Sequence, residues 1–468
     1  MLRATDIADR IRRGEASAAT TIAETFDRLE ARNPALNAFI RTDRAAAEEA
    51  AAAIDAKVRA GIDPGPLAGV PFGVKDMEAC AGFPVTQGSW FLRDSPPEKK
   101  DSRHVARMRA AGAIPIGMTA SAEFGMDSAT FTKLWGATRN PWNTATTPGG
   151  SSGGSSAAVA AGIVPLATGT DAGGSIREPA AFTGIIGLKP SHGRIPKANG
   201  FSNWGVHGAL AANVADAARH LDVTGGPDDG DRQSLPAPGY SYERIIETLD
   251  VRGMRAVFSP DFGYAAVESE VVAITEAAAR KLMAAAGLVH VTADFAPVNI
   301  YPHWGAIFGS TLEEDFIASG YLPDGFDRLS NCVQRVIGRV RERKRLGTID
   351  VKKSWEQVHL LEQQVAGFFK DHDLLFSPAT SCRPYGAEDA PPKVIEGKDA
   401  SQGGAEPFGM LANACWNPSI SIPAGMTSDG LPVGLQITAR RHRDDVLLRL
   451  ARIAEQMMPW PYWPDLNR

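Results

Sequence analysis

Residues 147–190 read TPGGSSGGSSAAVAAGIVPLATGTDAGGSIREPAAFTGIIGLKP. Two clusters of glycine and serine, at 149–154 and 173–175, lie on either side of an apolar, alanine-rich segment that favours a helix. Glycine lets the backbone approach a bound group closely and turn N–H groups toward it, and serine adds hydroxyls at the same place. The pattern therefore predicts either a serine-based active site or an anion cradle at the start of a buried helix.

A linker or a nucleotide-binding loop fits the residues around these clusters less well. A flexible linker has polar flanks, whereas AAVAAGIVPLAT and FTGIIGLKP are typical of a core. A phosphate-binding loop needs Gly-Lys-Ser/Thr, which the sequence lacks, and no βαβ start frames the glycines as a dinucleotide site would require. Gly-x-Ser-x-Gly matches through Ser151 and again through Ser152, which leaves a Ser–His–Asp hydrolase open.

A lysine at the end of an apolar segment favours a different serine chemistry. Residues 67–76 read LAGVPFGVKD and predict a buried strand that ends near Lys75. Burial disfavours the ammonium form and lowers the pKa of a lysine, so the neutral amine can take a proton from a serine. Asp76 would oppose this shift, but adjacent strand residues point to opposite faces, and we expect Asp76 to point away. Lys75 is therefore the expected base.

Several blocks together resemble the amidase signature family, in the order in which that family has them. The resemblance is specific over residues 65–195 and 410–455 and weak over about 230–400, which we interpret as a variable region that sets substrate specificity. The blocks that carry it are GVPFGVKD (69–76), GATRNPWN (136–143), GGSSGG (149–154), GTDAGGSIR (169–177), GLKP (187–190), PSISIPAG (418–425) and GLPVGLQ (430–436).

The resemblance implies a Ser–cisSer–Lys triad at Lys75, Ser151 and Ser175. In the family the bridging serine precedes the nucleophile by 24 residues, which selects Ser151 (175 − 151) over Ser152. Ser175 would be the nucleophile, Ser151 the proton relay after a cis peptide bond, and Lys75 the base. The backbone N–H groups of Ala172, Gly173, Gly174 and Ser175 would form the oxyanion hole. Asp171 and Arg177 are expected to hold this loop in shape rather than react.

The same resemblance implies an α/β fold, in which a single large mixed β-sheet is wrapped by α-helices. We expect one amidase domain over residues 1–468, because no linker-like segment divides the chain. Helices are expected near 18–32, 43–60, 210–224 and 267–286, with a break at Asn33-Pro34.

Composition narrows the function further. The net charge of −5 offers no basic excess for binding nucleic acid, and no apolar run is long enough to span a membrane. Four cysteines without Cys-x-x-Cys spacing predict reduced thiols in a cytoplasmic protein. The histidines, among them His104, His192, His207 and His303, look isolated and lack His-x-x-x-His spacing, so we expect no metal and no cofactor.

The expected activity is hydrolysis of a carbon–nitrogen amide bond in a small-molecule amide, through an acyl-enzyme on Ser175. Substrate contacts are expected at Gly125, Met126 and Ser151, with Trp204 and Trp304 as candidates for an aromatic pocket. One alternative is the amidase subunit of a tRNA-dependent amidotransferase, although the Arg-Tyr-Gly motif of that subunit is missing here. A non-catalytic binding relative is a second alternative, and a homodimer stays open.

Overall fold

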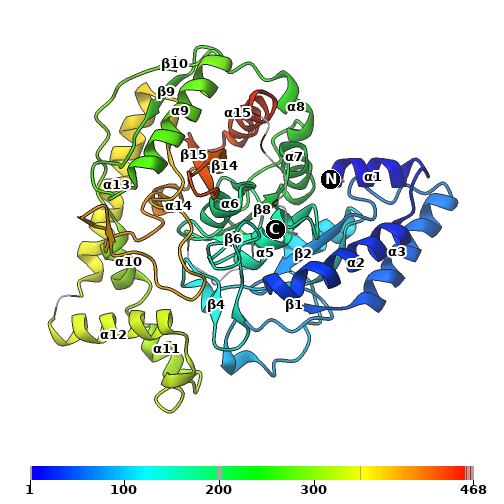
Figure 1. Ribbon diagram of the computed structural model, residues 1–468, viewed down its shortest axis with the longest axis horizontal. Coiled ribbons are helices and arrows are strands. Elements are labelled where there is room, and N and C mark those ends of the chain that lie inside the picture. The colour runs from blue at the N-terminus through cyan, green and yellow to red at the C-terminus, as the bar shows by residue number, and fades with distance from the viewer. Residues whose placement is uncertain (1–2, 198–202, 348, 459, 461–463, 465–468) are drawn as a thin grey trace.

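The protein is described by a computed structural model that covers residues 3–197, 203–347, 349–458, 460 and 464 (Figure 1). Its centre is an 11-stranded sheet in the order β1-β3-β2-β6-β8-β7-β14-β15-β11-β9-β10. The strands are β1 (Phe39–Thr42), β2 (Pro71–Lys75), β3 (Ile114–Thr119), β6 (Leu166–Asp171), β7 (Ile186–Lys189), β8 (Val206–Ala211), β9 (Arg255–Phe258), β10 (Val289–His290), β11 (Leu374–Pro378), β14 (Ser419–Met426) and β15 (Pro432–Ala439). The predicted large sheet is confirmed.

The sheet is mixed. Strands β3, β2 and β6 run parallel to one another at one end, and β11, β9 and β10 do so at the other end. The remaining neighbours pair antiparallel. Two small hairpins lie outside it, formed by β4 (Phe131–Thr132) with β5 (Gly136–Ala137) and by β12 (Val394–Ile395) with β13 (Lys398–Asp399).

Helices wrap the sheet, as the family resemblance predicted, with α1 to α3 on one flank and α10 to α13 on the opposite flank (Figure 1). The α-helices are α1 (Ala4–Arg12), α2 (Ala18–Leu36), α3 (Arg44–Arg59), α4 (Arg103–Ala110), α5 (Gly153–Ala160), α6 (Arg177–Thr183), α7 (Val214–Thr224), α8 (Tyr242–Thr248), α9 (Ser269–Ala285), α10 (Tyr301–Ile307), α11 (Leu312–Ala318), α12 (Asn331–Arg345), α13 (Val351–Asp371), α14 (Gly409–Ala414) and α15 (Asp444–Met457). Short 3₁₀ turns are η1 (Trp90–Leu92), η2 (Glu123–Gly125) and η3 (Phe326–Arg328).

Two local expectations were wrong. The predicted break at Asn33-Pro34 does not occur, because α2 continues through Pro34 to Leu36. Pro34 lies in the last turn of the helix, where few bonds remain to be lost, and the Asn33 side chain accepts from the N–H groups of Ala38 and Phe39 just beyond it. Residues 210 and 211 end β8 instead of beginning a helix, and α7 starts after its N-cap, Asn213.

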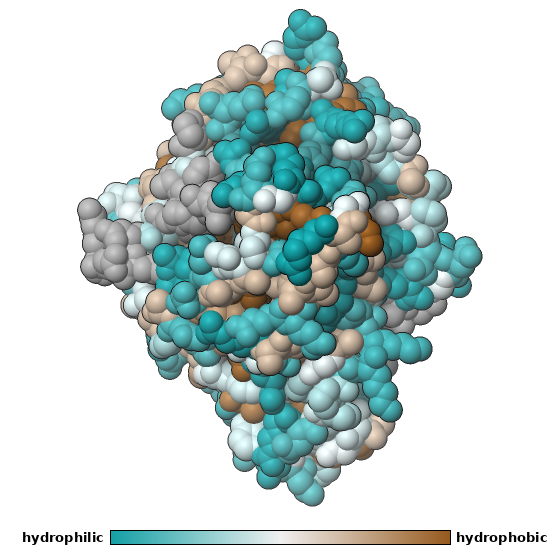
Figure 2. Space-filling view, turned by 90° about the vertical axis from the view of Figure 1, so that its right-hand side faces the viewer, coloured by the Kyte–Doolittle hydropathy of each residue, from teal (hydrophilic) through white to brown (hydrophobic). Residues whose placement is uncertain are grey.

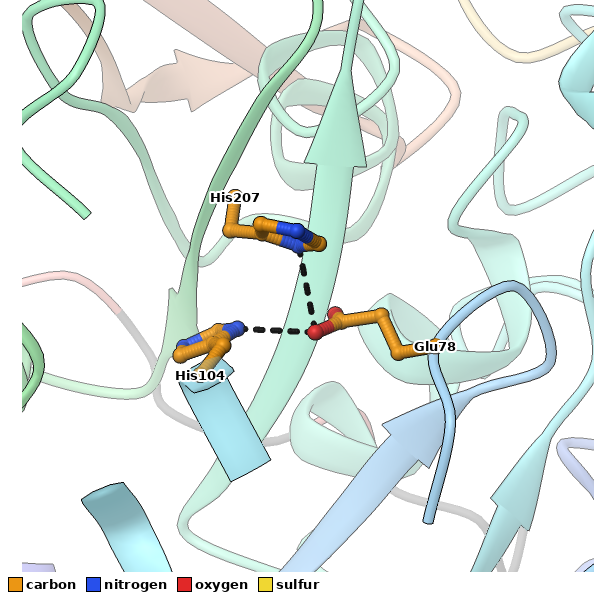
Figure 3. A group of neighbouring side chains, drawn as sticks. All are labelled: Glu78, His104 and His207. Atoms are coloured by element: carbon orange, nitrogen blue, oxygen red, sulfur yellow. Dashed lines mark hydrogen bonds and ion pairs between the residues drawn. The ribbon is translucent and has the colours of Figure 1, made fainter. Parts of the chain in front are cut away.

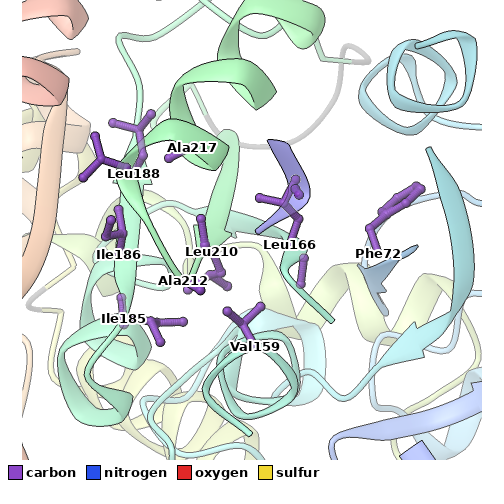
Figure 4. Packing of buried hydrophobic residues seen from close by; sticks show 14 of the residues in the cluster. Phe72, Val159, Leu166, Ile185, Ile186, Leu188, Leu210, Ala212 and Ala217 are labelled. Carbon is purple, nitrogen blue, oxygen red and sulfur yellow. The ribbon is translucent and has the colours of Figure 1, made fainter. Parts of the chain in front are cut away.

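The core around the catalytic strands is packed from several layers (Figure 4). Phe72 of β2 and Leu166 of β6 are fully buried, as is Leu210 of β8. Val159 of α5 packs into the same cluster, and all eight residues of that helix are buried. The glycine and serine clusters therefore begin and follow a helix that is held on every side, which is what fixes their position.

The outer surface has a different character. Figure 2 views the molecule from the side of the N-terminal helices and shows a largely hydrophilic face with small recessed hydrophobic areas. Helices α11 and α12 stand away from the body in Figure 1. Within the described part of the chain, no helix is both long and apolar enough to cross a membrane.

Candidate active site

Lys75 ends β2 inside the protein and contacts two hydroxyls. Its side chain has no exposed surface. Lys75 Nζ lies 2.8 Å from Ser151 Oγ and 2.8 Å from Thr170 Oγ1, and hydrogen-bonds to both. The peptide bond between Gly150 and Ser151 is cis, as expected. Strands β2 and β6 are direct neighbours, so the sheet itself holds Lys75 against Thr170 and against the serine cluster that precedes α5.

Burial sets the protonation of Lys75. Removal from water lowers its pKa to about 7, although the carboxylates of Glu78 and Asp171 act in the opposite direction. Asp76, the charge expected to oppose the shift, is turned away, and it accepts hydrogen bonds from the N–H groups of Thr86 and Gly88. Thus the orientation predicted for Asp76 is confirmed, but the opposing charges belong to Glu78 and Asp171.

Ser152 makes a different contact from that of its neighbour. Its hydroxyl is buried and donates to the carbonyl oxygen of Thr170 at 3.4 Å, and it makes no hydrogen bond with Lys75. Only Ser151 of the two serines hydrogen-bonds to the lysine. The structure therefore favours Ser151 as the proton relay on geometry, independently of the 24-residue spacing.

The loop that carries Ser175 is fixed by one buried carboxylate. Asp171 accepts from the N–H groups of Gly174 at 2.9 Å and Ile176 at 3.2 Å. It also accepts from Arg177 through Nε at 3.0 Å and Nη2 at 2.9 Å. Burial opposes this charge, yet Arg177 lowers the pKa of Asp171 to about 2. The expectation that Asp171 and Arg177 shape the loop is confirmed.

Ser175 stands at the partly exposed edge of this loop. Its hydroxyl makes no hydrogen bond to any described residue, and so no bond links it to Ser151 in this structure. The N–H groups of Ala172, Gly173 and Ser175 likewise have no acceptor among the described residues. The N–H of Gly174 already donates to Asp171, so the expected four-donor oxyanion hole is corrected to three donors.

Comparisons with known proteins agree with this geometry. The amidase family model matches residues 20–448. An acylamidase of Rhodococcus erythropolis is 34% identical over 471 residues, which are 98% of this chain and 96% of the relative. The chain belongs to the amidase signature family. A subunit of the glutamyl-tRNA(Gln) amidotransferase of Salinispora tropica is also 34% identical, over 98% of both chains.

Solved structures give the same result for this amidase. A bacterial aryl acylamidase superposes with a TM-score of 0.90 at 28% identity, over 99% of this chain and 98% of that one. A 6-aminohexanoate cyclic dimer hydrolase superposes with a TM-score of 0.87 at 29% identity, over 100% and 99% of the two chains. The amidase is thus an amidohydrolase of the general class that acts on linear amide bonds.

The residues expected to contact substrate lie on two sides of Ser151. Gly125 has φ +71°, and a Cβ built on it would lie 3.0 Å from the Met77 side chain and 3.5 Å from Ser151 Oγ. Glycine is therefore needed there to leave the relay hydroxyl open. Met126 is partly exposed, and its carbonyl oxygen accepts from the Cys332 thiol at 3.0 Å. Trp204 and Trp304 both pack on Phe308, in a hydrophobic cluster of the fold.

Two acidic residues beside the nucleophile loop were not anticipated from the sequence. Burial raises the pKa of Glu178 well above its usual range, and Glu406 adds to that shift. Burial likewise raises the pKa of Glu406 to about 8. A Cβ on Gly174 would come within 2.6 Å of Glu406 Oε2. Glu178 follows the GGSIR block directly and was open to detection, whereas Glu406 comes from a segment where the family resemblance is weak.

The expectation that the histidines are isolated was wrong for three of them. His104 and His207 meet at Glu78, and His220 lies against His104. Spacing along the chain hid this, because the four residues come from the turn after β2 and from α4, β8 and α7. His192 and His303 lie outside this group: His192 stacks on Trp416, and His303 lies 3.1 Å from Ser354.

Proposed function

We propose that this amidase hydrolyses small acyl amides through an acyl-enzyme on Ser175. The observation that carries the proposal is the buried contact of 2.8 Å between Lys75 Nζ and Ser151 Oγ, with burial lowering the pKa of Lys75 to about 7. A lysine with that pKa is largely neutral at and above pH 7, so it can act as a general base.

In the first half-reaction, Ser175 Oγ attacks the amide carbonyl carbon. Its proton passes to Ser151 Oγ while the Ser151 proton passes to Lys75 Nζ. The negative charge that forms on the carbonyl oxygen is stabilised by the free N–H groups of Ala172, Gly173 and Ser175. The C–N bond then breaks, and the leaving nitrogen takes the proton back from Lys75 through Ser151. An ester on Ser175 and a free amine result.

The second half-reaction repeats these proton transfers with water. The neutral relay takes a proton from water, the hydroxide oxygen bonds to the acyl carbon, and the ester C–O bond breaks. Ser175 recovers its proton from the relay, and a carboxylic acid leaves. No other group is needed for the proton balance, because Lys75 ends each half-reaction neutral.

Aryl and alkyl acyl amides are the substrate class we propose. Two relatives are named acylamidase and aryl acylamidase. Methionines surround the reacting groups: Met77 lies against Gly125, Met410 lies against Gly173, and Met126 is partly exposed nearby. Flexible, polarizable side chains of this kind adapt to apolar and aromatic groups. An uncharged acyl anilide fits such a lining better than a charged amide does.

A fluorophosphonate probe and a panel of amides test the proposal together. We expect one adduct, on Ser175, and turnover of acyl anilides that Ser175→Ala lowers by at least about 10⁴-fold. Ser152→Ala is the matched control and should keep both the adduct and the activity. An adduct on Ser152, or an active Ser175→Ala variant, would refute the assignment of the nucleophile.

The relatives also favour a second candidate, a glutaminase subunit of an amidotransferase, because such subunits are as similar in sequence as the acylamidase. The fold comparison separates them: the subunit from Thermotoga maritima superposes with a TM-score of only 0.76, against 0.90 for the aryl acylamidase. We expect the isolated chain to hydrolyse anilides without releasing ammonia from glutamine. The reverse outcome would establish the second candidate.

A further inference from the structure

Two histidines converge on one carboxylate inside the protein (Figure 3). His104 Nδ1 lies 2.9 Å from Glu78 Oε2, and His207 Nδ1 lies 3.1 Å from the same oxygen. Glu78 and His104 have fully buried side chains, and the His207 side chain is 16% exposed. Three elements meet here, since Glu78 follows β2, His104 lies in the first turn of α4 and His207 lies on β8.

Hydrogen bonding within this group leaves buried polar atoms unsatisfied. Glu78 Oε1 and His207 Nδ1 have no hydrogen-bond partner, although His207 Nδ1 is only 3.1 Å from Glu78 Oε2. The short distance without a bond means that the ring nitrogen is not aimed at the oxygen. Buried polar atoms without a partner are rare in folded proteins, and a missing ion or water is a common reason for them.

A third histidine orients the first. His104 Nε2 lies 2.7 Å from His220 Nε2, so one proton is shared between these two nitrogens. If His104 Nε2 carries it, His104 Nδ1 is left with a free lone pair directed at the Glu78 side. Histidines that bind metals are held in this way, with the second ring nitrogen donating to a neighbouring acceptor.

We propose that Glu78, His104 and His207 bind one divalent transition-metal cation of the zinc type. Two imidazole nitrogens and one carboxylate oxygen form a ligand set that suits zinc and similar ions. One ligand atom from each residue lies within 4.8 Å of the other two. Ligand atoms around a tetrahedral ion with bonds of about 2.0–2.2 Å are a little over 3 Å apart, so small rotations of the side chains bring the three onto one ion.

The location defines what the ion would do. Glu78 donates its backbone N–H to the carbonyl oxygen of Lys75 at 2.9 Å, and His207 pairs with Thr170 across β8 and β6. The ion would therefore join the turn after β2 to α4 and β8, behind the strands that present Lys75 and Thr170. Its role is structural, because the proton transfers proposed above use none of its ligands. The partly exposed edge of His207 is the entry route.

Metal content of the whole protein tests the proposal directly. The chain is produced without an affinity tag, freed of metal by chelation and dialysed against Zn²⁺ or Co²⁺. We expect about one tightly held equivalent of either ion and a rise in melting temperature on binding, because an ion that binds only the folded state stabilises it. Bound Co²⁺ should show visible absorption bands of a four- or five-coordinate site.

Variants and a map of the ion make the test decisive. His207→Gln and Glu78→Gln should each weaken binding by at least about 10-fold, while His303→Gln, a histidine outside the group, should leave binding unchanged. Zinc-edge anomalous diffraction of the wild-type protein needs no variant, and it should place the ion between Glu78, His104 and His207. Less than about 0.1 equivalent in the wild type, equal binding by His207→Gln, or an anomalous peak elsewhere would overturn the proposal.

Discussion

The loop between β6 and α6 and the α11–α12 region differ in how their charges are held. Arg177 and Asp171 form a pair whose side chains are 1% and 0% exposed. Arg341 of α12 and Glu313 of α11 form a pair at 2.8 Å whose side chains are 47% and 21% exposed. The first pair orders the backbone beside the nucleophile, whereas the second joins two helices at the surface. The same pair of chemical groups is thus a fixed support in one region and a weak contact in the other.

Helix ends show the same contrast. No side chain caps the N-termini of α10, α11 and α12. In contrast, a side chain accepts from the backbone at the start of α2, α3, α4 and α7. A missing cap costs about 1 kcal/mol of helix stability. The reacting groups are thus held rigidly by the sheet, and the flank assigned to substrate specificity is the less constrained part.

The largest effect should come from breaking the relay in the fixed region. Lys75→Met and Ser151→Ala should each lower kcat/KM by roughly 10³-fold or more, because proton transfer from Ser175 fails. The double variant should be little worse than the worse single variant, since the two residues act as one unit. Steady-state kinetics on an acyl anilide measures this, and multiplicative losses would show that the two residues act separately.

The next effect concerns stability. Arg177→Met should lower the free energy of unfolding by about 3–5 kcal/mol, because it leaves the Asp171 carboxylate buried without its cation. Urea unfolding followed by circular dichroism measures the change. A loss below about 1 kcal/mol would mean that the loop is held by the backbone bonds alone.

A smaller effect should follow from pH. The pKa of Lys75 is lowered to about 7, so the neutral base is present above that pH and is lost below it. We expect kcat/KM to fall about tenfold for each pH unit below 7 and to level off above about 8. A profile from pH 5 to 10 with an uncharged anilide tests this. Continued increase up to about pH 10 would point to an ordinary, charged lysine.

The smallest effect should come from the exposed pair. Arg341→Met removes its contact with Glu313 and should change the free energy of unfolding by no more than about 1 kcal/mol. It is the matched control for Arg177→Met, because the same residue type is exchanged in the other region. A loss as large as that of Arg177→Met would remove the proposed distinction between the two regions.

Much of the site could be predicted because its residues lie in short blocks with strong local chemistry. The apolar segment before Lys75 predicted a buried lysine, and the glycine and serine clusters predicted the turns around α5. The role of Gly174 could not be predicted in this way. Whether its N–H is free depends on Asp171, whose carboxylate reaches it only after β6 and the loop have folded.

The residues missed by sequence reasoning share a physical cause. Glu406 lies next to Gly174 although 232 positions separate them (406 − 174). Glu78, His104 and His207 come together from three elements that show no common spacing. Side chains that meet across a sheet leave no period in the sequence, because the distance along the chain between them depends on connecting segments of arbitrary length.

By itself, the sequence determined the α/β class, the family and the identity of the candidate base, relay and nucleophile. Those features depend on local patterns of burial and backbone freedom, which are set by neighbouring residues. Tertiary structure alone decided which charges act on Lys75, which N–H groups stay free and where the histidines gather. These properties depend on the electrostatic field and on hydrogen-bond partners in three dimensions, and both exist only when distant strands lie side by side.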